Sequence, residues 1–194
     1  MRLLIVLLLS SVTASTQQQK RAQVDFPTKE EINLVVTQAE RAFEQYKTSV
    51  AMEANLQSAR DEPSALRKDE EVVEMSHKLI EALKKNPGGF HGLGGLLLLS
   101  ALDDASRNAA LCSTSGTGEI AKGLIDRFDA KEAYRIMTII QTCTDVSTHL
   151  YTVSESVHAL MVRELEAQQD LNEQATQMAN ECNAAIKNLP KKKQ

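Results

Sequence analysis

Aromatic residues are few in this chain, and acidic residues outnumber basic ones. It has no tryptophan, four phenylalanines and three tyrosines, and its formal net charge is −4. Removing residues 1–14 takes away one arginine and leaves a net charge of about −5. Single-stranded nucleic acid is held by stacking on aromatic side chains, and any nucleic acid needs its phosphates neutralised. The composition therefore predicts no nucleic-acid partner.

Glycine and proline are also scarce, with eight and four in 194 residues, and neither occurs between Leu124 and Leu189. No stretch alternates apolar and polar residues in the manner of a half-buried strand. Apolar residues recur instead at spacings of three and four. We therefore predict an all-α protein, an elongated helical bundle of about five helices with a very long last helix.

Catalytic and cofactor motifs are missing as well. The four histidines form no H-E-x-x-H pair and do not stand at metal-ligand spacing from a cysteine. The glycines at 92–95 do not follow a strand, and those at 116–118 lack the Gly-Lys-Ser/Thr of a phosphate-binding loop. The sequence predicts a non-enzymatic protein with no cofactor and no metal site.

The N-terminus has the pattern of a secretory signal peptide. Arg2 precedes a short apolar run, and small residues around Ala14 suit cleavage there. Residues 15–27 should form a flexible, glutamine-rich arm. Within it, Lys20 and Arg21 are either a processing site or two solvated charges. These features predict a secreted, extracellular protein.

The rest of the chain is predicted to be a single α-helical domain over residues 28–189, followed by a basic tail at 190–194. Thr28 and Glu31 form a capping-box pattern at the start of a helix that runs to about residue 60. A second helix should cover 64–85 and a third 90–111. A flexible connection at 112–118 and a short helix at 119–128 should precede the last helix.

The last helix carries a heptad seam of about three and a half repeats. The seam is either the internal core or a surface for self-association. Beyond it the apolar phase slips, which predicts either a stutter or a break near Asp170. The candidate partner seam comprises Ile136, Ile139, Val146, Leu150, Val153, Val157 and Leu160.

The segment from Phe90 to Leu102 is apolar almost all round, as expected for a helix surrounded by protein or lipid. It is too short to cross a membrane alone. We expect it to be a central helix, and the alternatives are the wall of an apolar-ligand site or a segment that enters a membrane. Its candidate residues are Phe90, Leu93, Leu96, Leu97, Leu98, Leu99 and Leu102.

The chain has three cysteines, so in an oxidising compartment one thiol is left over. Cys143 and Cys182 would be about 58 Å apart along a continuous helix, far beyond the reach of a disulfide. Cys112 can fold back onto the start of the last helix. We therefore predict a Cys112–Cys143 disulfide, with Cys182 free or bridging two chains.

These features favour an extracellular protein that binds an as yet unidentified protein or receptor through its helices, with self-association as one form of such binding. A first alternative is a carrier of lipid or of a small apolar ligand that lays amphipathic helices on a lipid surface. A second alternative is a membrane-active helical protein.

Overall fold

The computed structural model describes residues 24–57, 64–126 and 129–187, and these residues form helices almost throughout. They make four α-helices and one short 3₁₀-helix, with no strand among them. The all-α prediction is therefore confirmed. The predicted signal peptide, most of the arm with Lys20 and Arg21, and the basic tail lie outside the described residues.

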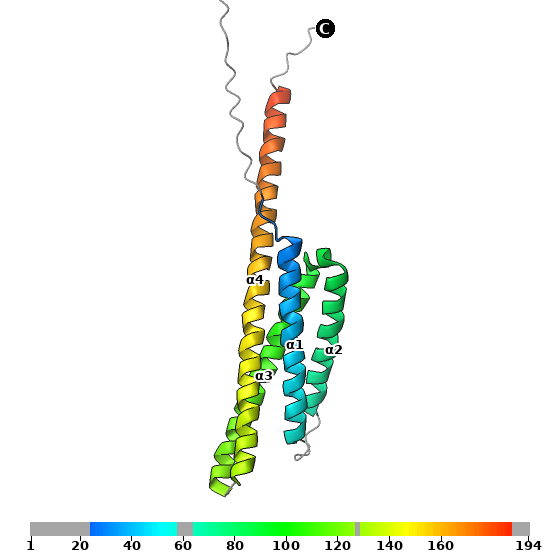
Figure 1. Cartoon of the computed structure of the whole chain (residues 1–194). Coiled ribbons are helices and arrows are strands. Elements are labelled where there is room, and N and C mark those ends of the chain that lie inside the picture. Colours follow the sequence, from blue (N-terminus) through cyan, green and yellow to red (C-terminus); the bar gives the residue numbers. More distant parts are fainter. Residues whose placement is uncertain (1–23, 58–63, 127–128, 188–194) are drawn as a thin grey trace, which may run out of the picture.

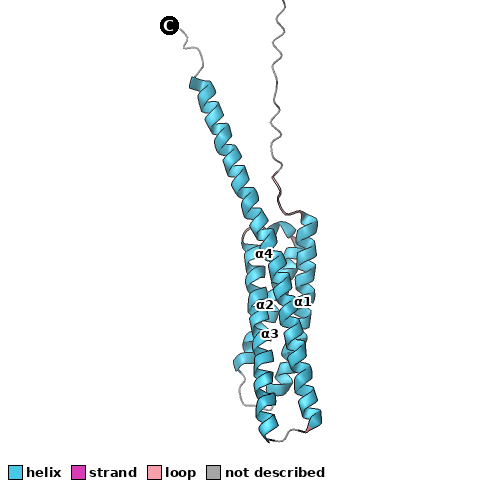
Figure 2. Cartoon of the chain, turned by 90° about the vertical axis from the view of Figure 1, so that its left-hand side faces the viewer, coloured by secondary structure: helices cyan, strands magenta, loops and turns pink. Residues whose placement is uncertain are grey.

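The four helices pack side by side and alternate in direction along the chain (Figure 1). The elements are α1 (Lys29–Gln57), α2 (Ser64–Lys85), η1 (Pro87–Phe90), α3 (Leu93–Asp126) and α4 (Ala130–Lys187). Each helix contacts the next one, and α4 also packs against α1. Figure 2 shows that α4 continues well past the ends of its neighbours. We call the part in which the four helices contact one another the helical core.

One apolar cluster fills the helical core and draws on all four helices. Tyr46, Ile80, Leu102 and Leu150 are among its fully buried members, one from each helix. Most of the folding free energy of such a protein comes from removing these apolar side chains from water, at about 25 cal/mol per Å². The helices therefore hold one another in place, because none of them could bury its apolar face alone.

The predicted capping box at the start of α1 is present. The backbone N–H of Thr28 donates to Glu31 Oε2 at 2.7 Å, and the N–H of Glu31 donates to Thr28 Oγ1 at 3.2 Å. At the start of α4 the cap is simpler, since the Asp129 carboxylate accepts from the Lys131 N–H at 2.6 Å. Both caps satisfy N–H groups that lack a partner within the helix.

The connection predicted at residues 112–118 is not a loop. It lies within α3, which runs unbroken from Leu93 to Asp126 and includes residues 119–126 of the short helix predicted at 119–128; residues 127–128 lie outside the described residues. The chain thus has four α-helices over the described residues, where about five were expected. Residues around Gly116 pack closely against α4, since a Cβ at Gly116 would lie 2.6 Å from Ile140 Cγ1. We attribute the helical conformation of residues 112–118 to this packing. The small residues here allow α3 and α4 to approach closely.

The last helix does not break near Asp170. It is continuous from Ala130 to Lys187, 58 residues in all. The phase slip in its apolar pattern is therefore a stutter within one helix.

The glycines around the start of α3 form a tight corner. Gly92 has φ = +86°, a left-handed conformation that residues with a side chain rarely adopt. A Cβ at Gly94 would lie 2.0 Å from the carbonyl oxygen of Gly89. The sequence therefore needs glycine here because the chain turns sharply and the first turn of α3 packs against backbone.

Candidate functional site

Cys112 and Cys143 form a disulfide that ties α3 to α4, with their Cα atoms 6.1 Å apart. This is the pairing that the sequence predicts. Both residues are buried in a small second cluster with Ile139, against which Met52 packs. Cys182 is a free, exposed cysteine. Because α4 is one continuous helix, Cys182 lies far along it from the disulfide.

The predicted apolar segment is divided between the helical core and the surface. Phe90, Leu98 and Leu102 are fully buried, and Leu99 is partly buried against the core. Three leucines lie instead on the outer side of α3, where Leu93 is 73% exposed, Leu96 51% and Leu97 54%. The expectation that the whole segment is surrounded by other helices is therefore wrong for these three. They form an exposed leucine cluster on the first turns of α3.

The heptad seam of α4 is internal. All seven predicted seam residues, from Ile136 to Leu160, are buried, and Val146, Leu150, Val153, Val157 and Leu160 belong to the main core. The seam is therefore covered by the helices of the same chain and offers no open surface to a partner. Of the two alternatives for the seam, the internal core is therefore the one that the structure shows.

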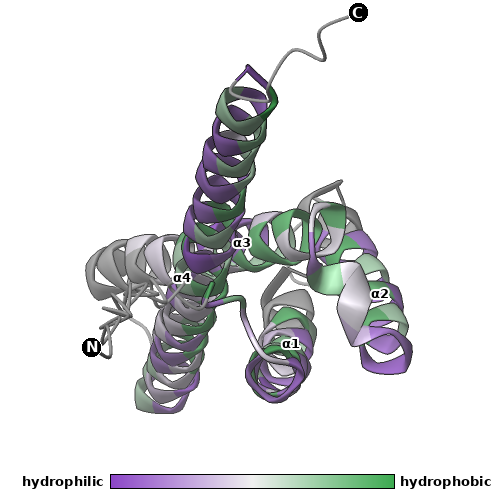
Figure 3. Cartoon of the chain, turned by 90° about the horizontal axis from the view of Figure 1, so that it is seen from above, coloured by the Kyte–Doolittle hydropathy of each residue, from purple (hydrophilic) through white to green (hydrophobic). Residues whose placement is uncertain are grey.

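Beyond the helical core, α4 projects as a single helix (Figure 1). Ala167 is its last buried residue, and every residue from Gln168 to Lys187 is exposed except the half-buried Gln174. We call residues 168–187 the projecting segment. Its length is about 30 Å at 1.5 Å per residue. In Figure 3 its hydrophilic and hydrophobic residues lie on different sides of the helix.

A buried polar cluster joins the other three helices, and no motif in the sequence predicts it. Asp69 of α2 accepts hydrogen bonds from Tyr46 Oη at 2.9 Å and from Asn108 Nδ2 at 2.7 Å. Burial raises the pKa of the Asp69 carboxyl, and the two hydrogen bonds offset part of that effect. The three residues are far apart in the sequence and match no motif. The cluster fixes the register of α1, α2 and α3, since a slip would leave a buried carboxyl without donors.

An ion pair closes the end of the helical core from which α4 projects. The guanidinium of Arg163 donates through both terminal nitrogens to the Glu31 carboxylate, in one case at 2.8 Å, and thereby links α4 to the cap of α1. The hydrogen bonds from Arg163 and Thr28 lower the pKa of Glu31 to about 2. Nearby, His91 Nδ1 lies 3.3 Å from Glu164 Oε2. The base of the projecting segment is thus firmly held to the core.

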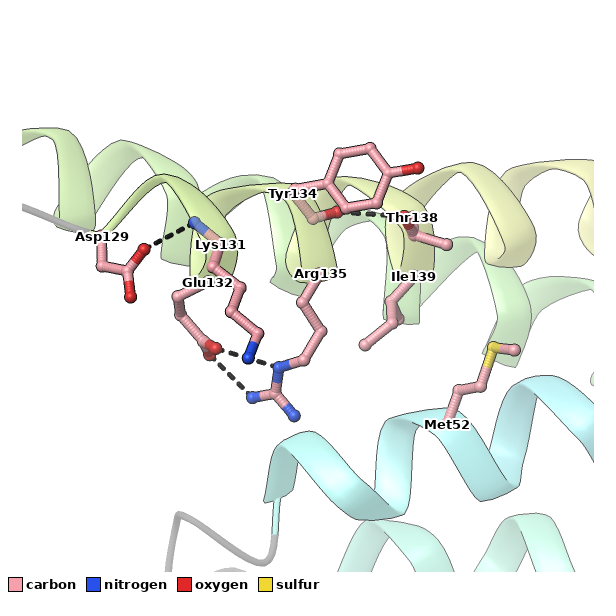
Figure 4. A pocket seen from close by; sticks show the side chains of 8 residues that line it. All are labelled: Met52, Asp129, Lys131, Glu132, Tyr134, Arg135, Thr138 and Ile139. Carbon is pink, nitrogen blue, oxygen red and sulfur yellow. Dashed lines mark hydrogen bonds and ion pairs between the residues drawn. The ribbon is translucent and has the colours of Figure 1, made fainter.

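A pocket of about 620 Å³ lies at the opposite end of the helical core, between the end of α1 and the start of α4 (Figure 4). Met52 and Ile139 form its apolar part. Its main charged groups neutralise each other, because Arg135 donates to both oxygens of Glu132 at 2.7 and 3.0 Å. The hydrogen bonds from Arg135 also lower the pKa of Glu132.

Two further classes of site are missing from the part of the chain that the structure describes. No group of three or more histidine, cysteine and acidic side chains there is arranged to hold a metal ion. No helix among the same residues is both long and apolar enough to cross a membrane. The projecting segment and the exposed leucine cluster are two candidate surfaces on the described residues.

Comparison of the chain with models of protein families, with curated proteins and with solved structures finds no match.

Proposed function

We propose that this protein is a secreted, non-enzymatic interaction protein that binds a protein partner through the projecting segment of α4. The observation that carries the proposal is a helix of about 30 Å whose residues are exposed, except for the half-buried Gln174. Helices in proteins are stabilised mainly by packing of an apolar face, and this segment extends beyond the helices of its own core. A helix that extends so far from its own core fits a role in which a partner covers it.

The chemistry of the segment supports a protein partner over a lipid surface. Helices that lie on membranes are rich in lysine and arginine on their polar face. Residues 168–187 contain Asp170, Glu173 and Glu181 and only one basic residue, Lys187. An acidic helix is repelled by anionic lipid headgroups, whereas an amphipathic helix of either charge can pack into a groove of another protein.

The test uses immobilised full-length protein and extracellular fluid of the source organism. Leu171→Asp/Ile186→Asp places two charges on exposed apolar positions of the segment. We expect this variant to lose proteins that the unaltered chain captures, with an unchanged melting temperature. Thr176→Asp/Asn180→Asp, which adds the same charge on the polar side, is the matched control and should capture normally. Equal capture by all three proteins would contradict the proposal.

A second candidate function is lipid binding through the exposed leucine cluster. Leu93, Leu96 and Leu97 project from one side of α3 and are more than half exposed. Co-sedimentation with neutral phosphatidylcholine vesicles tests it, with Leu97→Asp as the disruptive variant. Met75→Asp is the control, since Met75 is an exposed apolar residue on α2. Loss of vesicle binding in the Leu97 variant alone would support this function, and no binding by the unaltered chain would exclude it.

A further inference from the structure

We infer that the projecting segment pairs with the same segment of a second copy of this chain, in parallel, and that a Cys182–Cys182 disulfide joins the two copies. The inference rests on the proposed function and names the partner. It is drawn from the apolar pattern of the segment, from its charges and from the free cysteine.

The apolar residues of the segment form one narrow stripe. Their spacings are four, three, four and four, which keeps them on one side of a helix with 3.6 residues per turn. The structure leaves the stripe exposed, with Leu171 39% and Ile186 64% accessible. We call this set the C-terminal stripe; it consists of Leu171, Ala175, Met178, Cys182 and Ile186.

The charged residues of the segment stay away from the stripe. At about 100° per residue, Glu181 lies about 100° from Cys182, Asp170 about 120° and Glu173 about 180°. Two copies can therefore bring their stripes together without opposing their carboxylates. This distribution suits self-association, because like charges beside the interface of a homodimer would repel each other.

Cys182 lies within the stripe and is the cysteine that the fold leaves over. Cys112 and Cys143 are joined in a disulfide, which is compatible with the oxidising extracellular environment of the proposed function. In a parallel two-fold pair every stripe residue faces its own counterpart. Helices that pack about 10 Å apart, each with Cα atoms about 2.3 Å from its axis, bring facing Cα atoms to about 5.4 Å. This distance falls within the range that disulfides require.

The stripe also explains why a covalent link is needed. Only Leu171, Met178 and Ile186 are large apolar side chains, whereas a stable interface of ordinary size has roughly 20–30 residues on each side. Such a thin stripe can align two helices but holds them weakly. A disulfide makes the packing intramolecular, which raises the effective concentration of one stripe for the other to about the millimolar range.

The bond forms by thiol–disulfide exchange with a low-molecular-weight disulfide such as oxidised glutathione. The Cys182 thiolate of one chain attacks it, forming a mixed disulfide and releasing one glutathione thiolate. The Cys182 thiolate of the second chain then attacks the protein sulfur of the mixed disulfide and releases the second glutathione. Two protein thiols lose two electrons and two protons, and one glutathione disulfide gains both as two thiols.

The test is to follow dimer formation by the full secreted chain in a glutathione redox buffer, with non-reducing electrophoresis and sedimentation equilibrium. We expect a disulfide-linked dimer that reverts to monomer on reduction, and Cys182→Ser should be monomeric at low micromolar concentration. Leu171→Asp/Ile186→Asp should form the dimer at least tenfold more slowly, whereas Thr176→Asp/Asn180→Asp should match the unaltered chain.

Moving the thiol tests the parallel register. In a Cys182→Ser background, Ala175→Cys should restore the dimer because position 175 also lies on the stripe. Asn180→Cys lies on the opposite side and should not restore it. A dimer formed equally by the 175 and 180 variants would show random oxidation of exposed thiols and would overturn the inference, as would failure of the 175 variant.

The two proposals fail in different ways. A chain that stays monomeric in the redox buffer, yet still loses a captured partner on Leu171→Asp/Ile186→Asp, overturns self-pairing and leaves partner binding standing. A chain that neither dimerises nor captures anything through this segment contradicts both.

Discussion

Truncation of two adjacent leucines in α3 gives the sharpest test of how this helix is oriented. Leu98 is 0% exposed and lies in the main core, whereas its neighbour Leu97 is 54% exposed. Leu98→Ala leaves a cavity that the surrounding helices cannot fill, and such changes cost about 2–5 kcal/mol. We expect about 3 kcal/mol for Leu98, because its side chain is completely enclosed. Leu97→Ala should cost below about 1 kcal/mol, since full burial of a leucine contributes only about 2 kcal/mol.

The measurement is urea and thermal unfolding of both variants, followed by the circular dichroism of the helices. For a protein of this size about 1 kcal/mol corresponds to 2–4 °C, so Leu98→Ala should lower the melting temperature by about 6–12 °C. Leu97→Ala should lower it by less than about 4 °C. The variants are made in a Cys182→Ser background so that cross-linking does not contribute. Similar losses in both, or a larger loss for Leu97, would refute the orientation of α3.

Three further predictions concern contacts that the structure adds to the sequence. Tyr46→Phe removes a donor from the buried Asp69 carboxyl and should cost about 1.5–3 kcal/mol at neutral pH in urea unfolding; no measurable loss would mean that Asp69 is solvated. The pKa of Glu31 is lowered from 4.5 to about 2, so its ionised form stabilises the fold above pH 4.5 and this contribution is lost as the pH falls toward 2. The stability deficit of Glu31→Gln should therefore shrink over that pH window, and a constant deficit would exclude the ion pair as its cause. Gly94→Ala should destabilise the protein, since its Cβ would clash with the Gly89 carbonyl, whereas Gly118→Ala meets no atom within 4 Å and should stabilise α3 by up to about 1 kcal/mol, as thermal unfolding would show.

The exposed leucine cluster and the projecting segment are different kinds of surface. The cluster is a small apolar area on a helix that is otherwise held by the core. The projecting segment is a whole helix that extends beyond the core and carries the free cysteine. We expect vesicle binding to depend on the exposed leucine cluster and dimer formation on the projecting segment, so the experiments above distinguish the two surfaces.

The sequence by itself determined which segments are helical and where several of the helices begin and end. Helix caps, glycine and proline influence the backbone over only a few residues. The capping box of Thr28 and Glu31 and the scarcity of glycine and proline can therefore be recognised directly in the sequence. The disulfide was also predictable, because the fixed rise of a helix rules out a bond between Cys143 and Cys182, and Cys112 can fold back onto the start of the last helix. The spacing of three and four identified the seam but not what would cover it.

Tertiary structure alone decided the features that depend on residues distant in sequence. Residues 112–118 have the composition of a loop, yet packing of Gly116 against Ile140 and the disulfide hold them in α3. Leu97 and Leu98 are chemically identical, and only the positions of the other helices make one exposed and the other buried. The Asp69 cluster likewise needs three helices in register. Local patterns fix which segments become helices, whereas burial depends on where the other helices lie, and that arrangement is a property of the whole chain.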